Sequence, residues 1–473
     1  AYMAAYPYDC IEQRLSVAVA TGDRAKWDAA AALLPAYLDR DGLVRFFPAD
    51  WIAGDDSLTG YILRLSTDAG WPLPADTRAK MIAGLTGFVG GKVARPHDNV
   101  LVVEKGKKVV GTASFGGEGA LRRLAAIAAL QTQNAATPAM VEPLSVAPDA
   151  WPTATLIDWV TVLRLPGIPD ASAKLVQALN VLRARLDLQG TRLTITRADD
   201  PWQLLSSPDL TAARLLTAVV ALPDWRADAP RIARGLMLNQ RRGHWDTTPA
   251  NAVGTLAMRA FSARFEATPV AGTTLATIGT VSHAFDWSHA PPPATLAWPP
   301  AAIPLALRHS GSGAPWAIVT SRAAVPLIVP FASGFAVHRS VAAVSQAVPG
   351  IWSRGDVMKV RVEVAARAPV AWVAVNDPVP AGATILGGSL GGRSDLLAAG
   401  ATTGLQPTFV ERRTEAVHAH YERLDRATVV YEYTLRLGST GTFHLPPTRV
   451  EALYSPEMVA LVPNADVTVA ARR

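Results

Sequence analysis

The stretch Tyr6-Pro7-Tyr8-Asp9-Cys10-Ile11-Glu12-Gln13 lies near the start of the chain and contains its one cysteine. Gln13 follows Cys10 by three positions. Proline is tolerated in the first turn of a helix, so a helix with Pro7 in that turn would place Cys10 and Gln13 one turn apart on one face. A thiol and a carboxamide held there can condense with loss of ammonia. We therefore predict an internal thioester between Cys10 and Gln13.

Composition and length point to a globular chain of more than one domain. The 473 residues exceed what one hydrophobic core usually serves. Apolar residues make up 49% of the chain and charged residues 18%, which is not a disordered composition. A single cysteine excludes an internal disulfide framework. The net charge of +6 comes from scattered basic residues without interleaved aromatic residues, so we expect no nucleic-acid partner.

The first part of the chain, from about residue 9 to about residue 285, has helical periodicity punctuated by Gly and Pro. Alanine and leucine recur on one face of each predicted helix. The predicted helices are Asp28–Tyr37, Ser57–Asp68, Thr77–Phe88, Glu118–Leu130, Asp158–Leu165, Ser172–Leu186, Leu210–Leu222, Arg231–Leu238 and Asn251–Phe265.

A weak internal repeat runs through this helical part. In each unit an aromatic residue stands a few positions before a residue suited to begin a helix. With the thioester helix there are six such units, and repeats of this size are typical of stacked helical hairpins. Six hairpins favour a closed α/α toroid over an open solenoid. The aromatic residues are Trp51, Phe115, Trp151, Trp202 and Trp245.

A proline-rich run at 291–300 predicts a stiff linker, because consecutive prolines forbid both helix and sheet. After it, short β-branched runs alternate with turn residues, which favours antiparallel β-sandwich structure. Within it, Val357–Val364 alternates between apolar and polar residues. The predicted strands are Trp316–Thr320, Val325–Val329, Phe335–Ser340, Val357–Ala365, Ala371–Val375, Phe409–Arg413, Ala416–Arg423, Thr428–Leu437, Gly441–Leu445 and Val467–Ala470.

Several phrases of the sequence resemble the bacterial alpha-2-macroglobulins. The stretch Tyr6–Gln13 looks like the thioester signature of that family. The segment Gly42–Tyr61 is similar to the one that follows the thioester helix, and Gly243–Ala252 is similar to a phrase of the last toroid unit. Asn376–Gly382 and Phe443–Glu457 resemble the final macroglobulin-like domain.

The resemblance implies a multidomain α + β fold, in which an α/α toroid with the thioester precedes antiparallel β-sandwich domains. We expect a helical thioester domain at 1–290, the linker at 291–300, and a C-terminal macroglobulin-like β-sandwich at 341–473. Residues 301–340 would be the return strands of an interrupted, CUB-like β domain. The chain would then be the C-terminal part of a longer protein.

The resemblance also implies a function. The family's proteins are protease-trapping inhibitors, which capture the attacking protease after cleavage of a bait region that this sequence lacks. The captured protease would be acylated through Lys amines or hydroxyl groups. Such a chain is a single-use acylating inhibitor and not an enzyme, and needs no cofactor. We expect a periplasmic location, with an inner-membrane lipoprotein anchor in the full-length protein, and a peptidoglycan synthase of the penicillin-binding class as a further partner.

The thioester must be shielded from water until it is needed. Tyr6 and Tyr8 are the local candidates for this cover, and an adjacent sandwich domain can complete it. Glu12 either acts on the leaving thiolate or stabilises the helix N-terminus. The histidines of the second half are too dispersed to predict a metal site: His418 and His420 share a strand face, but two ligands are insufficient.

Two alternatives remain open. Enzymes built on α/α toroids use acidic residues at the toroid centre, and Asp55-Asp56 and Asp199-Asp200 are acidic pairs in loops. Acidic residues also favour helix N-termini, which is the competing structural reading of both pairs. The second alternative is a structural relative with an inactive thioester site.

Overall fold

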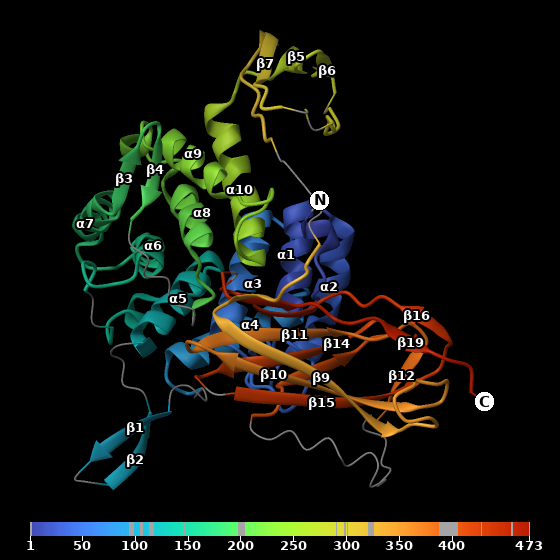
Figure 1. Ribbon diagram of the computed structural model, residues 1–473. Helices are drawn as coiled ribbons and strands as arrows, with labels where there is room; N and C mark the ends of the chain where they lie inside the picture. Colours follow the sequence, from blue (N-terminus) through green and yellow to red (C-terminus); the bar gives the residue numbers. More distant parts are fainter. Residues whose placement is uncertain are drawn as a thin grey trace.

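The computed structural model combines a helical part and two stacked antiparallel sheets (Figure 1). It describes residues 2–93, 99–104, 107–112, 118–144, 147–196, 204–289, 291–297, 299, 301–319, 326–386, 405–426, 428–455 and 457–472. Of the residues singled out above, Phe115, Asp199, Asp200 and Trp202 lie outside this description.

The predicted helices are confirmed with shifts of a few residues at their ends. The helices of the described part are α1 (Ile11–Thr21), α2 (Arg24–Tyr37), α3 (Asp56–Ala69), α4 (Ala75–Val89), α5 (Glu118–Thr132), α6 (Thr153–Val162), α7 (Ala171–Ala184), α8 (Pro208–Val219), α9 (Ala229–Asn239) and α10 (Thr248–Phe265). None of these helices is both long and apolar enough to cross a bilayer. Two hairpins interrupt them, β1 (Asn99–Glu104) with β2 (Lys107–Thr112) and β3 (Leu186–Gln189) with β4 (Arg192–Ile195).

Side-chain caps begin several helices where the sequence repeat places them. Asp55 caps α3, Ser207 caps α8 and Thr247 caps α10, each accepting a hydrogen bond from a backbone N–H of the first turn. Trp151 packs edge-on against Trp159 of α6, with ring centroids 5.9 Å apart.

The helices pack in a continuous sequence of neighbours. Helix α1 contacts α3, α3 contacts α5, α5 contacts α6, α6 contacts α8, α8 contacts α10, and α10 returns to α1. The remaining helices α2, α4, α7 and α9 each pack against a member of this series. Large buried side chains, among them Trp27, Trp159 and Trp225, fill the space between them.

The helical prediction is wrong for residues 271–286, which are strands. β5 (Ala271–Ile278) and β6 (Val281–Asp286) form a hairpin, and β7 (Leu305–Ser312) pairs with the other edge of β5. Only Gly279 and Thr280 separate β5 from β6, and Gly279 has φ 59°, so a two-residue turn sets this pairing.

Two predicted strands are also wrong. The described residues of Trp316–Thr320 and Val325–Val329 are not strands, and their apolar side chains, such as Ile328 with 82% exposure, lie on the surface. Pro315, Pro326 and Pro330 flank or begin these runs, and proline removes the N–H that a strand ladder needs.

The C-terminal part is a β-sandwich. One sheet has the order β12-β15-β10-β9 and the other β13-β14-β11-β17-β18-β8, and all described pairs are antiparallel. A further two-stranded sheet, β16-β19, lies beside them (Figure 1). The strands are β8 (Phe331–Ser333), β9 (Phe335–Ser345), β10 (Val357–Ala366), β11 (Val370–Pro378), β12 (Ala383–Leu386), β13 (Phe409–Arg412), β14 (Ala416–Leu424), β15 (Thr428–Leu437), β16 (Gly441–Phe443), β17 (Thr448–Ala452), β18 (Val459–Val462) and β19 (Val467–Val469).

Strand burial shows how the sandwich meets the helical part. In β10 every second residue is buried, as the alternating sequence predicts, so one face packs in the sandwich and the other is partly exposed. In β11 nearly every residue is buried. Val373 and Val375 belong to the sandwich core, whereas Trp372 and Ala374 pack with the helices. The six-stranded sheet therefore lies with its outer face against the helical part.

Strand pairing crosses two of the predicted domain boundaries. The sheet β6-β5-β7 spans residue 290, since β5 precedes it and β7 follows it. Residue 340 falls inside β9, and β8 pairs with β18 of the C-terminal sandwich. Strands 331–340 are thus built into the sandwich and not into a separate return element.

Candidate functional site

Cys10 and Gln13 meet at the first turn of α1. The helix begins one residue after Cys10, which is its N-cap, and Gln13 is the third helical residue. The Gln13 side chain reaches back, and its Oε1 accepts a hydrogen bond of 3.1 Å from the Cys10 N–H. Pro7 precedes the helix and is not in its first turn, so that expectation is wrong. The pair is held together by the reach-back typical of a capping box.

The Cys10–Gln13 pair is sealed from solvent. Cys10 is 2% exposed and Gln13 1%. Burial and the neighbouring Glu12 charge raise the pKa of the Cys10 thiol, against an opposing effect of the Gln13 and Glu12 backbone N–H groups. The Gln13 Nε2 has no hydrogen-bond partner among the described residues. The carboxamide is therefore fixed through its oxygen, and its nitrogen is left unheld.

Glu12 connects three parts of the fold. Its fully buried carboxylate accepts hydrogen bonds from Ser16 of α1, from Thr248 of α10 at 2.9 Å and from Tyr454 of the sandwich at 2.7 Å. Burial raises the pKa of Glu12, and the three hydroxyl donors oppose that rise. Tyr61 adds a contact to Ser16. Sequence reasoning placed Glu12 beside the site but missed this role, because two of its partners lie far along the chain.

Tyr8 and Tyr6 pack beside the pair. Tyr8 is 3% exposed and meets Tyr6 edge-on at 5.8 Å between ring centroids. Burial and the Glu451 carboxylate raise the pKa of Tyr8. On its other side Tyr8 contacts His418 and His420 of the sandwich, with centroids 5.7 and 6.2 Å apart. Tyr6 is only partly buried.

Aromatic side chains of the loop after α2 pack on the sandwich. Phe46 lies 4.3 Å from Trp372 between ring centroids, and Phe47 stacks on Phe409 at 4.3 Å. The Ile11 N–H donates to the Phe46 carbonyl, which fixes this loop against α1. Trp372 has φ 49°, a conformation that bulky residues rarely adopt. The sandwich thus completes the apolar surroundings of the Cys10 region, and it is Trp372, Phe409 and Tyr454 that supply the contacts.

Polar contacts add to this junction. Arg413 Nη2 donates to Asp9 Oδ1 at 3.1 Å, and Arg14 binds the other Asp9 oxygen at 3.0 Å. Trp51 Nε1 donates to the Thr408 carbonyl at 2.8 Å. Asp9, which directly precedes Cys10, is therefore tied to both parts of the fold.

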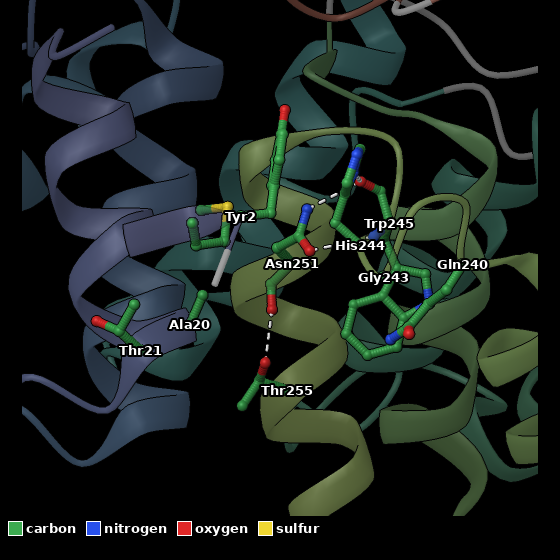
Figure 2. A pocket seen from close by; sticks show the side chains of 10 residues that line it. Tyr2, Ala20, Thr21, Gln240, Gly243, His244, Trp245, Asn251 and Thr255 are labelled. Carbon is green, nitrogen blue, oxygen red and sulfur yellow. Dashed lines mark hydrogen bonds between the residues drawn. The ribbon is translucent and has the colours of Figure 1, made fainter. Parts of the chain in front are cut away.

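The phrase Gly243–Ala252 shapes the start of α10. The Asn251 carboxamide donates to the Trp245 and Thr247 carbonyls at 2.9 and 2.7 Å. This clamp presents Thr248 to Glu12. A separate cavity of about 420 Å³ lies between α1 and α10, with Tyr2, His244 and Asn251 among its lining (Figure 2). Tyr2 stacks on His244 there, and the described lining residues include neither Cys10 nor Gln13.

The acidic pair Asp55-Asp56 has structural partners. Asp55 caps α3 through the Leu58 N–H, and buried Asp56 forms an ion pair with Arg122. Burial and the Asp56 charge raise the pKa of Asp55 to about 6. These contacts match the helix-capping interpretation and lend the enzyme alternative no support.

The sandwich brings together a cluster that the sequence did not predict. His418, His420 and Glu411 offer ligand atoms within 4.8 Å of one another. The two histidines alone do not predict a site, because the third member comes from β13, whose register against β14 is not visible in the sequence.

Comparisons with known proteins agree with this geometry. A family model for the bacterial alpha-2-macroglobulin MG10 domain matches residues 334–457. A search among curated proteins finds no match.

Solved structures of bacterial alpha-2-macroglobulins share the fold. The native Escherichia coli protein from domain MG7 to the C-terminus has a TM-score of 0.66 at 17% identity, covering 99% of this chain and 74% of that one. The native E. coli protein seen by cryo-electron microscopy gives 0.67 at 17% identity, covering 100% and 30%. A Salmonella protein reacted with methylamine gives 0.67 at 16% identity, covering 99% and 30%. This chain thus spans 30% of the length of the latter two. Residues 334–457 thus match the bacterial alpha-2-macroglobulin MG10 domain, and the chain as a whole shares the fold of the C-terminal part of bacterial alpha-2-macroglobulins.

Proposed function

We propose that Cys10 and Gln13 form an internal thioester, and that the chain is the reactive part of a protease-trapping inhibitor. The main support is that the Gln13 carboxamide is held against Cys10 by a hydrogen bond and that the two residues are only 1% and 2% exposed. In the bond-forming step the Cys10 sulfur attacks the Gln13 carbonyl carbon. The carbon–nitrogen bond breaks, and ammonia leaves with the thiol proton.

The hydrogen bond from the Cys10 N–H supports this step. It points at Gln13 Oε1, the oxygen that gains negative charge when a nucleophile adds to the carbonyl. Donors aimed at such an oxygen are among the strongest contributors to acyl-transfer rates. The same donor serves when a target amine or hydroxyl attacks the thioester. The carbon–sulfur bond then breaks, the Cys10 thiol is released, and the target is linked to Gln13.

The Cys10 thiol is released once and the thioester is not restored, so the reaction is a single-use acylation and not catalytic turnover. The protein therefore needs a cover that excludes water before the target arrives. Tyr8, Trp372 and the Glu12–Tyr454 hydrogen bond supply it in this proposal. Separation of the sandwich from the helical part would expose Gln13 to a target.

We also propose that the helical part is an α/α toroid. Support comes from the series of contacts in which α1 meets both α3 and α10, with α2, α4, α7 and α9 packed against that series. The sandwich would be a separate C-terminal module that covers one face of this toroid.

In the full-length protein the targets would be proteases that cleave a bait region elsewhere in the chain, and the location the periplasm. The Salmonella relative was solved after reaction with methylamine, a small amine of the kind that opens a thioester. A lipoprotein anchor and a peptidoglycan synthase partner stay predictions of the family resemblance.

The test is covalent capture by the full-length protein. It is incubated with trypsin and separated on a denaturing gel, beside a Cys10→Ala variant and a Tyr421→Phe control in the sandwich core. We expect protease-containing bands of high mass for wild type and control, and bait cleavage without those bands for Cys10→Ala. Equal adducts from Cys10→Ala, or none from wild type, would contradict the proposal.

A further inference from the structure

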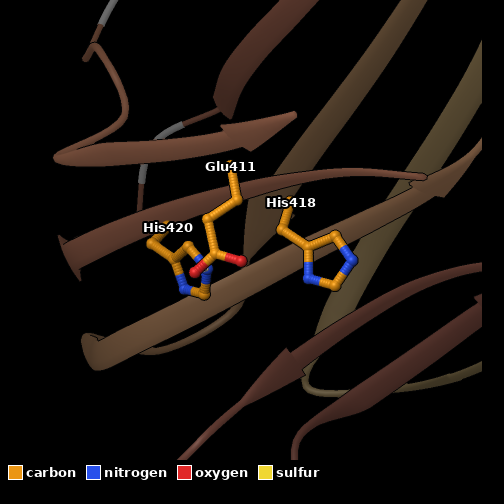
Figure 3. A group of neighbouring side chains, drawn as sticks. All are labelled: Glu411, His418 and His420. Atoms are coloured by element: carbon orange, nitrogen blue, oxygen red, sulfur yellow. Dashed lines mark ion pairs between the residues drawn. The ribbon is translucent and has the colours of Figure 1, made fainter. Parts of the chain in front are cut away.

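Glu411, His418 and His420 project from one sheet face. Glu411 of β13 pairs directly with His418 of β14, and His420 follows two residues later on the same face. The residues that alternate with the two histidines on β14 point to the other face and belong to the sandwich core; they are Val417, Ala419 and Tyr421. In Figure 3 the Glu411 carboxylate overlaps the His420 ring, and the His418 ring lies apart from both.

Three of the four imidazole nitrogens are buried without hydrogen-bond partners in the described part of the chain. His418 is 4% exposed and His420 1%. His418 Nδ1 and both ring nitrogens of His420 have no partner among the described residues. Buried polar atoms in folded proteins are almost always satisfied, and a bound ion is one of the recognised explanations for those that are not. Three unpartnered nitrogens in one place therefore call for a ligand.

The spacing suits a metal ion. His420 Nε2 and Glu411 Oε1 lie 3.8 Å apart, and the ligand atoms of the set lie within 4.8 Å of one another. Ligands at 2.0–2.1 Å around a tetrahedral zinc ion are separated by roughly 3.3 Å. Side-chain rotations that move these atoms by about 1 Å would close the set around one ion.

A neighbouring cation orients the carboxylate. Arg413 binds Glu411 Oε2 through two hydrogen bonds, of 2.8 and 3.2 Å, which leaves Oε1 turned toward His420.

We propose that Glu411, His418 and His420 form a binding site for one divalent transition-metal cation of the zinc class. Two imidazoles and one carboxylate favour Zn²⁺ and its first-row neighbours over Ca²⁺ and Mg²⁺, which take oxygen ligands. The site lies beneath Tyr8, whose ring meets both imidazoles, and Arg413 joins Glu411 to Asp9. It is thus adjacent to Cys10 but uses none of the thioester atoms.

The test is metal binding by the chain, made without a histidine tag and stripped with chelator. Zn²⁺ and Co²⁺ are titrated by calorimetry, and Co²⁺ also by its visible absorption. We expect one ion per chain, with affinity reduced at least about 100-fold in His420→Gln and in Glu411→Gln, because even outer-shell changes at metal sites cost ~10–100-fold. His338→Gln, an exposed histidine of β9, is the matched control and should bind as wild type does.

Further variants separate this site from the thioester. Cys10→Ala should bind Zn²⁺ unchanged, whatever the state of the thioester, and loss of binding there would assign the ion to the thiol and overturn the proposal. Zn²⁺ should raise the melting temperature of wild type and Cys10→Ala. If His420→Gln fails to fold, the metal affinity of Glu411→Gln tests the site instead, because Glu411 is only partly buried. The site would be refuted if wild type bound no stoichiometric metal, or if these substitutions did not change the affinity. A buried water would then be the partner of the imidazole nitrogens.

Discussion

Tyr454→Phe removes one hydroxyl from the junction between the sandwich and the helical part and leaves the ring in place. That hydroxyl donates at 2.7 Å to the buried Glu12 carboxylate, one residue from Ile11 and two from Cys10. A hydrogen bond to a charged group contributes about 1.5–3 kcal/mol. The remaining donors to Glu12, Ser16 and Thr248, both come from helices. The variant therefore loses this link between sandwich and α1 and keeps those within the helical part.

The loss should appear as faster reaction of the proposed thioester. If the sandwich must separate from α1 before an amine reaches Gln13, a junction weakened by 1.5–3 kcal/mol opens roughly 10–150 times more often. The assay is the rate of methylamine incorporation, followed by intact mass under excess amine.

Tyr421→Phe is the matched control, because Tyr421 is fully buried in the sandwich core and its hydroxyl has no partner among the described residues. We expect that variant to react at the wild-type rate. A Tyr454→Phe rate equal to both would refute the idea that this hydrogen bond holds the cover closed.

Three further outcomes follow from the same contacts. Thr248→Val should lower the free energy of unfolding, measured in urea, by about 1.5–3 kcal/mol, because it removes a buried hydrogen-bond donor to Glu12. The control Thr255→Val loses only a hydrogen bond within α10 and should lower it far less. Equal losses in the two variants would contradict this prediction. Folding raises the pKa of Asp55 from 3.8 to about 6, so the folded protein binds this proton more tightly. The stability that this gives is fully present below pH 3.8 and is lost as the pH rises toward 6. Asp55→Asn, which keeps the cap, should lose about 1–3 kcal/mol less unfolding free energy over this range, and parallel pH curves for the two proteins would contradict the prediction. Arg413→Gln removes partly exposed ion pairs to Asp9 and Glu411, so it should speed methylamine incorporation by no more than about 5-fold, with the effect vanishing in 1 M salt. A larger, salt-independent change would show that more than charge is lost.

Local patterns of the sequence predicted the parts of the molecule that depend on neighbours in the chain. Cys10 and Gln13 meet because the first turn of a helix brings residues three apart together. The alternation at Val357–Val364 gave β10 correctly, since a half-buried strand has period two. The helices from Arg24 to Phe265 likewise follow their apolar period.

The rest depends on pairing between distant segments. Glu12 finds Thr248 and Tyr454 across separations of 236 and 442 residues, which no local pattern encodes. The cluster of Glu411, His418 and His420 needs the register of β13 against β14 to bring Glu411 opposite His418. Strands β5 and β6 were missed because their hairpin turns at Gly279-Thr280, a weaker signal than Asn-Gly, and because their partner β7 follows only after the proline-rich run.

The intact mass of freshly purified protein tests the proposed bond between Cys10 and Gln13. We expect a mass lower than that of the sequence by one ammonia, then one methylamine adduct with a newly reactive thiol, and neither change in Cys10→Ala. A full-length protein with the plain sequence mass, unchanged by methylamine, would contradict it.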